Sequence, residues 1–424
     1  MDGKLRRFAL SARIYLLAMT KWVGVAVVTG ALCGGIGTAF HVGVERVTEL
    51  RAVYPWLVYL LPLLGLAVVG IYKLCRVEGI GTDNILEEVH SGRGVSLALL
   101  PAIFFSTLLT HLGGGSVGRE GAALQMGGAI GYQSARLLRL DESDTRTSTT
   151  IGMAAFFSAL FGTPMAATVF ALEITNVGRV YYAQMFPCLV ASLTAFGVSL
   201  LLGVAPTAFV VTVPGVEPVM LLRVTLLSVL CAYLSVLFCE VIHAVGKQAV
   251  KRLPNPWLRA VIGGGVIVLL TLALGTTDYN GAGMGIITAA VERGTARPAA
   301  FACKLIFTAI TLAAGFKGGE VVPSFFVGAT FGCVIGPLLG VPASFAAAIG
   351  LVAVFCGAVN CPLASTFLAL ELFGSQGLIY FALVCTLSFV LSGYSGIYSS
   401  QRILYNKLKA QYINVQTNNH REGE

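Results

Sequence analysis

Charged side chains are scarce in this chain of 424 residues. Asp, Glu, Lys and Arg together make up 11% of the sequence, whereas hydrophobic residues make up 56%. In an average globular domain about a quarter of the residues are charged, so this composition excludes a water-soluble domain. The few basic residues are not interleaved with aromatic ones, and we therefore expect no nucleic-acid partner.

Clustered cysteines are also missing. The ten cysteines form no CxxC pair, and the closest two are Cys356 and Cys361. They are scattered mainly through apolar stretches, which is typical of inert buried thiols. We expect neither a metal nor another cofactor.

What the sequence has instead is a series of long uncharged runs. Most of them reach the length of roughly 20 residues that crosses a bilayer as a helix. The fifty glycines and fifteen prolines, many inside these runs, predict short, broken or re-entrant helices that line a cavity. The expected fold class is an all-α polytopic membrane protein. The runs cover residues 22–40, 52–72, 95–118, 149–172, 180–216, 321–370 and 372–401.

Much of the net charge of +8 sits at the two ends of the chain. The positive-inside rule then predicts that both termini are cytoplasmic. The first run is long and has no clear cleavage site, so we interpret it as a retained span of a multi-pass protein of the bacterial inner membrane. The terminal basic residues are Lys4, Arg6, Arg7, Arg13 and Lys21 before the first run, and Arg402, Lys407 and Lys409 after the last.

The chain contains an internal sequence repeat, whose two copies are offset by about 200 residues. Each matched pair is weak alone, but the nearly constant offset indicates a duplication. The matched pairs are His41 with His243, Pro55-Trp56-Leu57 with Pro256-Trp257-Leu258, Gly79-Ile80-Gly81 with Gly281-Ala282-Gly283, Glu120 with Glu320, and Leu172-Glu173 with Leu370-Glu371.

Charge suggests how the two copies are oriented. The loop near residues 45–51 has balanced charges, whereas its counterpart near 247–259 carries four basic residues and no acidic one. Equivalent loops therefore face opposite sides, which predicts an inverted-topology repeat with a binding site near the midplane. We expect a first half over 1–203 with its cytoplasmic N-terminal piece, an inverted second half over 204–395, and a final helix with a cytoplasmic tail over 396–424.

The stretch from Gly113 to Gly121 carries the chemistry. It places Arg119 and Glu120 after a glycine run, between two apolar segments. A charged side chain costs roughly 2.5 to 3.5 kcal/mol at membrane depth, so such a glutamate predicts function. Glycines expose backbone N–H groups, and a helix that begins near Glu120 adds its positive dipole end. This combination predicts an anion site.

Four motifs together resemble the CLC chloride channel and transporter family. They are Gly79-Ile80-Gly81, Gly118-Arg119-Glu120-Gly121, Gly318-Gly319-Glu320-Val321-Val322-Pro323 and the late Tyr398. The resemblance spans the whole membrane portion of the chain. It implies the CLC fold and a homodimer in which each subunit has its own pore.

Within that family the details resemble the fluoride/proton antiporter clade. Ile80 stands where chloride members have a serine, Ala122 where they have a proline, and Glu320 where they have an apolar residue. Ile80 and Val322 also differ from the methionine and threonine that occur in the fluoride clade. Ile174 replaces the second carboxylate that chloride exchangers use as a cytoplasmic proton relay.

The resemblance assigns roles to individual residues. Glu120 is expected to be the gate that carries the proton, and Glu320 a second proton site or a structural carboxylate. Glu173 and Glu371, which follow Pro164 and Pro362 at equal spacing, are expected to accept N–H bonds at buried helix ends. Lys317 is expected to be exposed. The anion-binding positions are Gly79, Ile80, Gly81, Gly118, Arg119, Gly121, Gly319, Val321, Val322 and Tyr398.

The expected function is export of fluoride in exchange for protons, with membrane lipid as the surroundings. A chloride-selective exchanger or channel of the same fold is the alternative. A hydrolase would need a strand before the G-x-S-x-G pattern at Gly114, Ser116 and Gly118, and an apolar membrane segment precedes it instead. The residues alone do not separate a channel from an antiporter.

Overall fold

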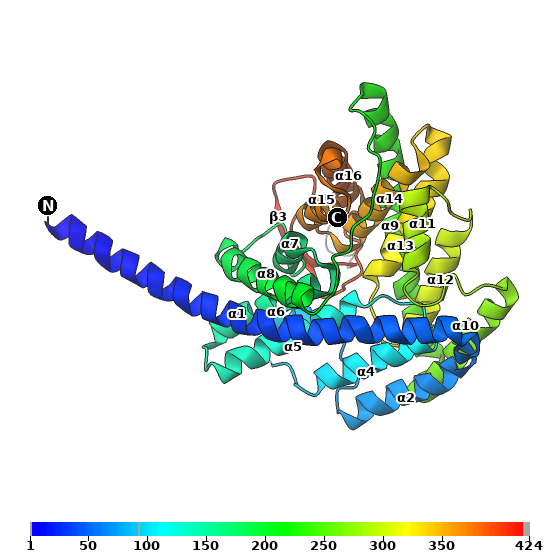
Figure 1. Cartoon of the computed structure of the whole chain (residues 1–424), viewed down its shortest axis with the longest axis horizontal. Coiled ribbons are helices and arrows are strands. Elements are labelled where there is room, and N and C mark those ends of the chain that lie inside the picture. Colours follow the sequence, from blue (N-terminus) through cyan, green and yellow to red (C-terminus); the bar gives the residue numbers. More distant parts are fainter. Residues whose placement is uncertain (1, 92–93, 419–424) are drawn as a thin grey trace.

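The computed structural model describes residues 2–91 and 94–418, which form sixteen α-helices and one small sheet (Figure 1). The first half holds α1 (Asp2–Val53), η1 (Pro55–Leu60), α2 (Leu61–Leu74), α3 (Thr82–Ser91), α4 (Leu99–Leu112), α5 (Glu120–Leu137), α6 (Glu142–Phe161), α7 (Pro164–Glu173), β1 (Asn176–Val177), η2 (Tyr182–Gln184) and α8 (Met185–Leu201). The second half holds α9 (Pro218–Arg252), α10 (Pro256–Leu274), α11 (Met284–Arg293), α12 (Ala300–Ala313), α13 (Val321–Ile335), η3 (Gly336–Leu339), α14 (Ala343–Val359), α15 (Pro362–Phe373), η4 (Ser375–Gly377) and α16 (Leu378–Leu391). Two strands, β2 (Arg402–Tyr405) and β3 (Tyr412–Gln416), follow.

The expected fold class is confirmed. Six of the described helical stretches are long and apolar enough to cross a bilayer, while others, such as α7 and α15, are shorter. The outer helices turn large apolar side chains outward: Leu63 on α2 is 63% exposed and Leu269 on α10 is 65% exposed. Such surfaces suit contact with lipid, because in water they would form large exposed apolar patches.

The centre of the molecule is built from four helices that are buried on nearly every side. They form two tight pairs, α5 with α6 and α13 with α14. In the first pair a Cβ at Gly152 would lie 2.0 Å from the carbonyl oxygen of Gly127, and in the second a Cβ at Gly350 would lie 2.2 Å from that of Gly328. Only glycine permits this approach of the backbones, as in other small-residue helix contacts in membranes. The same device recurs in both halves.

The two halves meet through equivalent residues. Gly118 and Gly319, which each lie two residues before a helix start, that of α5 and that of α13, form an isolated antiparallel bridge with each other. Helix α7 likewise packs against its counterpart α15. Contacts between identical positions of two copies are the mark of a two-fold relation, as an inverted repeat requires. The repeat predicted from the sequence therefore describes the fold.

The end of the chain differs from the prediction. A final helix was expected after residue 396, but β2 pairs in parallel with β1 and antiparallel with β3. The reason is local: Ile403 and Val415 point into a small core, and β-branched and aromatic residues favour strands. The polar composition of residues 416–424 also predicts a disordered tail. Gln416 belongs to β3, and residues 419–424 lie outside the described residues.

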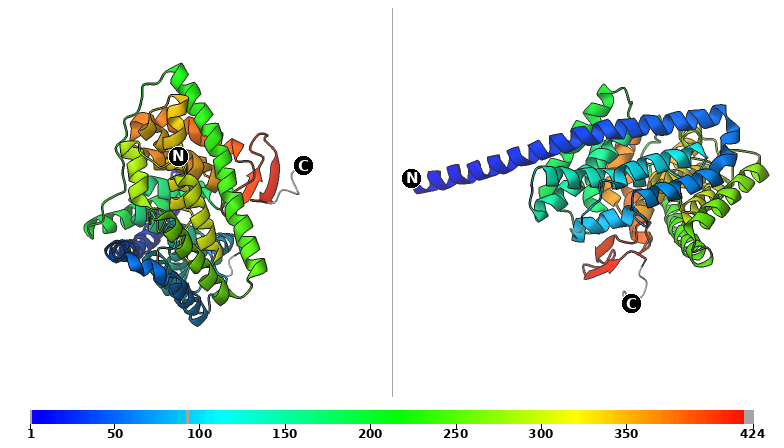
Figure 2. Two further views of the ribbon diagram at one scale, coloured as in Figure 1. Left: turned by 90° about the vertical axis from the view of Figure 1, so that its right-hand side faces the viewer. Right: turned by 90° about the horizontal axis from the view of Figure 1, so that it is seen from below.

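The connection between α5 and α6 is short, and most of the charged stretch from Arg136 to Arg146 is helical. Helix α5 continues to Leu137, and α6 already begins at Glu142 because Asp141 caps it, accepting a hydrogen bond from Asp144 N. Figure 2 shows the C-terminal sheet protruding from one face of the molecule, while α1 runs across the opposite side and extends well beyond the helical body at its N-terminal end.

Candidate functional site

The site is centred where α5 and α13 begin. Just before these helices Gly118 N donates to Gly319 O at 2.7 Å, and Gly319 N donates to Gly118 O at 2.8 Å. The first N–H groups of each helix have no partner within the helix, so two positive helix ends converge on one small volume. Gly118 and Gly319 are anion-binding positions by resemblance, but their own N–H groups are not free, because the two segments pair with each other here.

The Glu120 side chain occupies the converging helix starts. Its Oε2 accepts hydrogen bonds from Arg119 N at 2.9 Å and from Val322 N at 3.3 Å. The residue is fully buried, and its Oε1 has no hydrogen-bond partner among the described residues. One N–H group comes from each half of the chain, so this carboxylate is held as an anionic ligand between the two repeats.

Two further polar side chains in this region have an unpaired buried atom. Glu320 is the residue immediately before α13, and its Oε2 has no partner among the described residues. Tyr398 is 2% exposed, and its hydroxyl also has none. The Tyr398 hydroxyl interacts electrostatically with the carboxylates of Glu320 and Glu120. Buried polar groups are rarely left unpaired, so an unpaired carboxylate oxygen and an unpaired hydroxyl indicate a place for mobile ligands.

The first motif lies against the start of α5. Gly79 has a φ of +77°, a conformation that favours glycine. Ile80 N donates to Val77 O, and Gly81 N donates to Asn84 Oδ1, so these two N–H groups are already in use. The motif therefore contributes backbone shape near the site, and its amides of residues 80 and 81 are not free donors.

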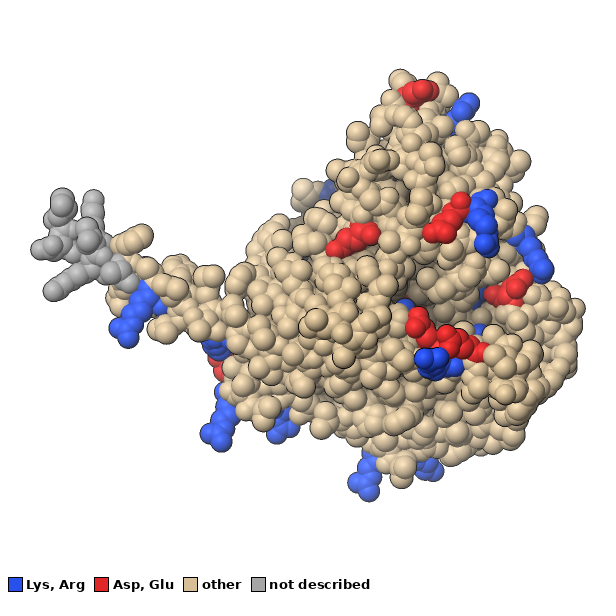
Figure 3. Space-filling model, in the orientation of Figure 1, with Lys and Arg blue, Asp and Glu red and all other residues tan. Residues whose placement is uncertain are grey.

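A hollow of about 540 Å³ reaches Glu120 from one face of the molecule. Arg119, Glu120 and Val322 line its floor, and Glu45 and Glu49 from the end of α1 line its rim. Figure 3 shows acidic and basic side chains gathered around a hollow on the face viewed in Figure 1. Glu120 therefore lies beneath this hollow, although its side chain is itself fully buried.

A second cavity, of about 390 Å³, lies beside α2. It is lined by Tyr72, Gly79, Arg259 and Lys317. We expected Lys317 to be exposed, but it is partly buried and its ammonium lies 4.1 Å from the centre of the Tyr72 ring. The first hollow contains Arg119, Glu120 and Val322, whereas this second cavity contains Gly79 and Lys317, so motif residues line both.

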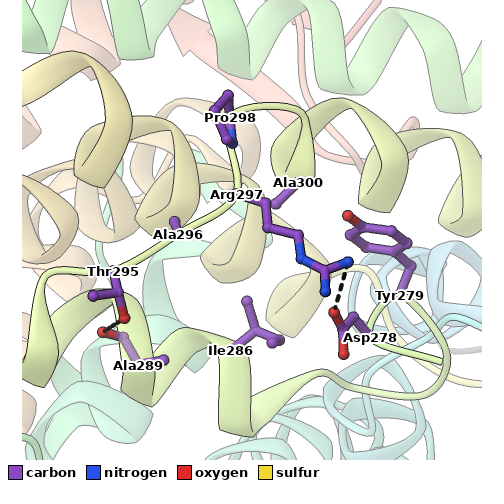
Figure 4. Close-up of a pocket in the computed structure, with 9 residues that line it drawn as sticks. All are labelled: Asp278, Tyr279, Ile286, Ala289, Thr295, Ala296, Arg297, Pro298 and Ala300. Carbon is purple, nitrogen blue, oxygen red and sulfur yellow. Dashed lines mark hydrogen bonds and ion pairs between the residues drawn. The ribbon is translucent and has the colours of Figure 1, made fainter. Parts of the chain in front are cut away.

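A third hollow, of about 490 Å³, borders the first one and is drawn in Figure 4. The Arg297 guanidinium points across it to Asp278, and their charged atoms are 3.4 Å apart. None of the anion-binding positions predicted from the sequence lines it. It is therefore a feature of the loops around α11 and not the candidate site.

Glu173 and Glu371 form a reciprocal pair across the two halves. Glu371 accepts from Met165 N at 2.9 Å and Ala166 N at 2.8 Å at the start of α7. Glu173 accepts from Leu363 N at 3.3 Å and Ala364 N at 2.9 Å at the start of α15. Each helix thus ends in a carboxylate that caps the beginning of its counterpart.

Two charged residues near the site were missed from the sequence. Lys304 on α12 is fully buried and donates to the carbonyl oxygens of Tyr279 and Gly281, which lead into the counterpart of the first motif. Asp83 at the start of α3 accepts two hydrogen bonds from Ser400. Lys304 could have been noticed as a lone charge in an apolar stretch. Nothing in the sequence pairs Asp83 with Ser400.

The G-x-S-x-G pattern forms no nucleophile elbow. Helix α4, and not a strand, precedes it, and Ser116 Oγ lies 3.1 Å from Thr308 Oγ1. The serine lies in the connection between α4 and α5 and is hydrogen-bonded to Thr308 and Thr311 of α12.

Comparison with known sequences identifies what this arrangement resembles. The family described as "Voltage gated chloride channel" matches residues 64–393. A "Chloride/fluoride channel protein" of Pseudomonas syringae pv. tomato is 36% identical over 96% of this chain and 92% of its own length. An "H(+)/Cl(-) exchange transporter ClcA" of Vibrio campbellii is 27% identical over 92% of this chain and 91% of its own length.

Solved structures agree with these matches. A CLC-type fluoride/proton antiporter superposes with a TM-score of 0.86 at 31% identity, covering 90% of this chain and 98% of that protein. A slow cyanobacterial Cl⁻/H⁺ antiporter superposes with a TM-score of 0.75 at 19% identity, covering 88% and 94%. The second similarity concerns the fold alone.

Proposed function

The chain belongs to the voltage-gated chloride channel (CLC) family, whose members move anions across membranes, and from this premise we propose that it exports fluoride in exchange for protons. The observation that carries the proposal is the Glu120 carboxylate. It accepts hydrogen bonds from the backbone N–H groups of Arg119, at the start of α5, and of Val322, in the first turn of α13. A carboxylate in that place stands where a halide would bind, and it can be protonated.

Competition between Glu120 and the anion explains how the two ions exchange. An ionised carboxylate holds the two N–H groups by charge-assisted hydrogen bonds. Protonation removes the charge, so the side chain binds the helix starts less well and an anion replaces it there. Because Glu120 also lines the hollow, it takes its proton from that side. Each proton that enters on Glu120 is thus exchanged for an anion that leaves.

Glu320 and Tyr398 complete the proposed site. The Glu320 carboxyl, placed at the start of the second helix, serves as a second proton site. The Tyr398 hydroxyl donates to the anion, since it is a buried donor with no protein partner among the described residues. Arg119 adds positive charge. Gly121 and Val321 contribute N–H groups of the first turns of α5 and α13.

Two residues of this chain and the descriptions of two similar proteins favour fluoride over chloride as the substrate. Ile80 supplies no hydroxyl, and Ile174, fully buried, supplies no second internal carboxylate. The 36% identical relative is described as a chloride/fluoride channel protein, and the structure with a TM-score of 0.86 as a fluoride/proton antiporter. Chloride/proton exchange, the activity named for the Vibrio relatives at 27% identity, is the second candidate.

The proposal includes the setting of the protein. It is a multi-pass homodimer of the bacterial inner membrane, with one pore in each subunit and both termini in the cytoplasm. The hollow beside the end of α1 then faces outward, and the cavity with Arg259 and Lys317 faces the cytoplasm. Its two basic side chains attract anions to the inner mouth. In the cell we expect the protein to confer fluoride resistance.

Reconstituted liposomes test the function directly. A fluoride gradient is expected to drive proton movement in the opposite direction, with fluoride flux far above chloride flux. The reversal potential, measured while the pH gradient is varied, separates an antiporter from a channel, because only coupled transport shifts it with pH. Equal chloride flux would reject the fluoride assignment, and a reversal potential independent of pH would reject exchange.

A further inference from the structure

The segment Ile397–Gln401, which carries Tyr398, is irregular but firmly held. Ile397 N donates to Ala358 O at 2.8 Å, and His243 Nε2 lies 3.1 Å from Ile397 O. At the other end the Gln401 side-chain amide donates to the carbonyl oxygens of Ile174 and Val359. Within this stretch the Tyr398 hydroxyl is left without a partner. Its position is therefore set by the backbone around it and not by a bond of its own.

Asp83, from the first half of the chain, holds Ser400, which lies two residues after Tyr398. Its Oδ1 accepts from Ser400 N at 2.8 Å and from Ser400 Oγ at 2.7 Å. Ser400 is 317 residues further along the chain. An acidic residue in the first turn of a helix ordinarily interacts with that helix's own N–H groups. Here both bonds of Oδ1 are used on the segment that presents Tyr398.

Thr82, the residue before Asp83, connects the start of α3 to α5, the helix that begins with Glu120. Thr82 Oγ1 donates to Gly121 O at 3.4 Å, and Gln125 Nε2 donates to Thr82 Oγ1 at 3.1 Å. Gly121 and Gln125 belong to α5, the helix that begins with Glu120. The start of α3 therefore bonds to the gate helix on one side and to the tyrosine segment on the other.

We propose that Asp83 is a positioning residue that fixes the distance between the Tyr398 hydroxyl and the Glu120 site, and thereby sets the size of anion that the site accepts. A site that discriminates between halides with few donors has to hold those donors rigidly. Without the two bonds to Ser400, the hydroxyl can withdraw and admit a larger anion. The inference rests on the proposed function for the identity of the preferred anion, and extends it to the residue that enforces the preference.

The first test compares three variants by their ratio of fluoride to chloride flux in liposomes. Asp83→Ala is expected to lower this ratio by about tenfold, mainly by raising chloride flux, since two hydrogen bonds to a charged group are lost. Asp83→Asn retains an oxygen that accepts both bonds, so its ratio stays close to that of the wild type. Asp141→Ala is the matched control, because Asp141 also accepts a backbone N–H bond at a helix start, that of α6, away from the site.

A purely structural role for Asp83 predicts a different result. Fluoride and chloride flux would then fall together in Asp83→Ala, as the amount of folded protein falls, and their ratio would not change. That outcome overturns the proposal. Should Asp83→Ala fail to fold, Ser400→Ala removes only the hydroxyl donor, and it is expected to lower the ratio by about threefold. An unchanged ratio in Ser400→Ala would count equally against the proposal.

A double-mutant cycle with Tyr398→Phe tests whether Asp83 acts through the tyrosine. If it does, Asp83→Ala changes the flux ratio no further once the hydroxyl is absent. Independent, multiplying effects of the two substitutions would overturn the proposal. The flux ratio of the wild type decides whether fluoride is the substrate. The double-mutant cycle compares changes in that ratio, and these can be measured whichever halide the wild type prefers. A failure of the proposed function is therefore distinguishable from a failure of the proposal for Asp83.

Discussion

At the scale of single residues, the site is defined by side chains whose polar atoms are not all satisfied. Glu120 Oε1, Glu320 Oε2 and the Tyr398 hydroxyl are buried without partners among the described residues. Leaving such a group unpaired costs about 1–3 kcal/mol, and a protein retains that cost where a ligand or proton supplies the missing partner. Glu173 and Glu371, in contrast, have both oxygens bonded to helix starts. Buried glutamates thus keep an unpaired oxygen at the proposed site, whereas those at the helix starts of α7 and α15 are fully bonded.

The Glu120→Gln variant tests the gate. Its amide oxygen still accepts the N–H bonds of Arg119 and Val322, but it carries no charge and no exchangeable acidic proton. We expect anion flux to persist while proton movement falls to background, measured with fluoride and pH electrodes on the same liposomes. Glu142→Gln, an exposed carboxylate on α6 that pairs with Arg146, is the matched control. Stoichiometric proton coupling in Glu120→Gln would remove Glu120 from its role.

At the scale of elements, the C-terminal strands β2 and β3 stand where the sequence predicted a final helix. The hairpin is anchored by Lys407, whose ammonium bonds to Asn360 Oδ1, Phe389 O and Ser392 Oγ at the ends of α14 and α16. The Phe389 ring lies under it, 4.3 Å away. The lysine therefore joins the hairpin to the C-terminal ends of α14 and α16.

The anchoring lysine gives stability a defined dependence on pH. Burial lowers the pKa of the Lys407 ammonium from its ordinary value of 10.5 to about 7. Between these values the unfolded chain holds a proton that the folded chain has lost, so the lysine's contribution to stability rises with pH from about 7 to about 10 and is constant below that window. Thermal unfolding in detergent is expected to show the wild type gaining in Tm relative to Lys407→Met over this range.

The control for this experiment is the same pair of proteins below pH 6. There the difference in Tm between wild type and Lys407→Met should not vary with pH, because Lys407 is protonated in both states. A difference that stays flat up to pH 9.5 would show that the side chain is not buried as described.

At the scale of the whole molecule, the two halves hold each other through equivalent contacts. The bridge between Gly118 and Gly319 places both helix starts at one point, and the reciprocal carboxylates join α7 to α15. A transporter built in this way has its ligand site on the boundary between the copies, where each copy supplies half of the donors. The hollow lined by Arg119, Glu120 and Val322 and the cavity lined by Gly79 and Lys317 both contain residues of the motifs.

The reciprocal caps predict how the halves are joined energetically. Glu173→Ala leaves the N–H groups of Leu363 and Ala364 without an acceptor, which should lower the free energy of unfolding by about 2–6 kcal/mol. Glu371→Ala should cost less, because Glu371 is more exposed than Glu173, which is 5% exposed. Both effects are measured by thermal or denaturant unfolding. The Gln variants, which keep one accepting oxygen, should be milder, and a loss no larger than that of exposed Glu142→Ala would contradict the role.

The sequence by itself determined the class of protein and the repeat, because long uncharged runs, loop charges and recurring motifs are local features of the chain. It also singled out Glu120 as a carboxylate at membrane depth. Only the tertiary structure decided which N–H groups Glu120 accepts, that Gly118 and Gly319 pair with each other, and that Asp83 holds Ser400. The physical reason is distance along the chain: apart from the neighbouring Arg119 N, these partners are about 200 to 317 residues apart. No local pattern of hydrophobicity or charge encodes a hydrogen bond between segments that only folding brings together.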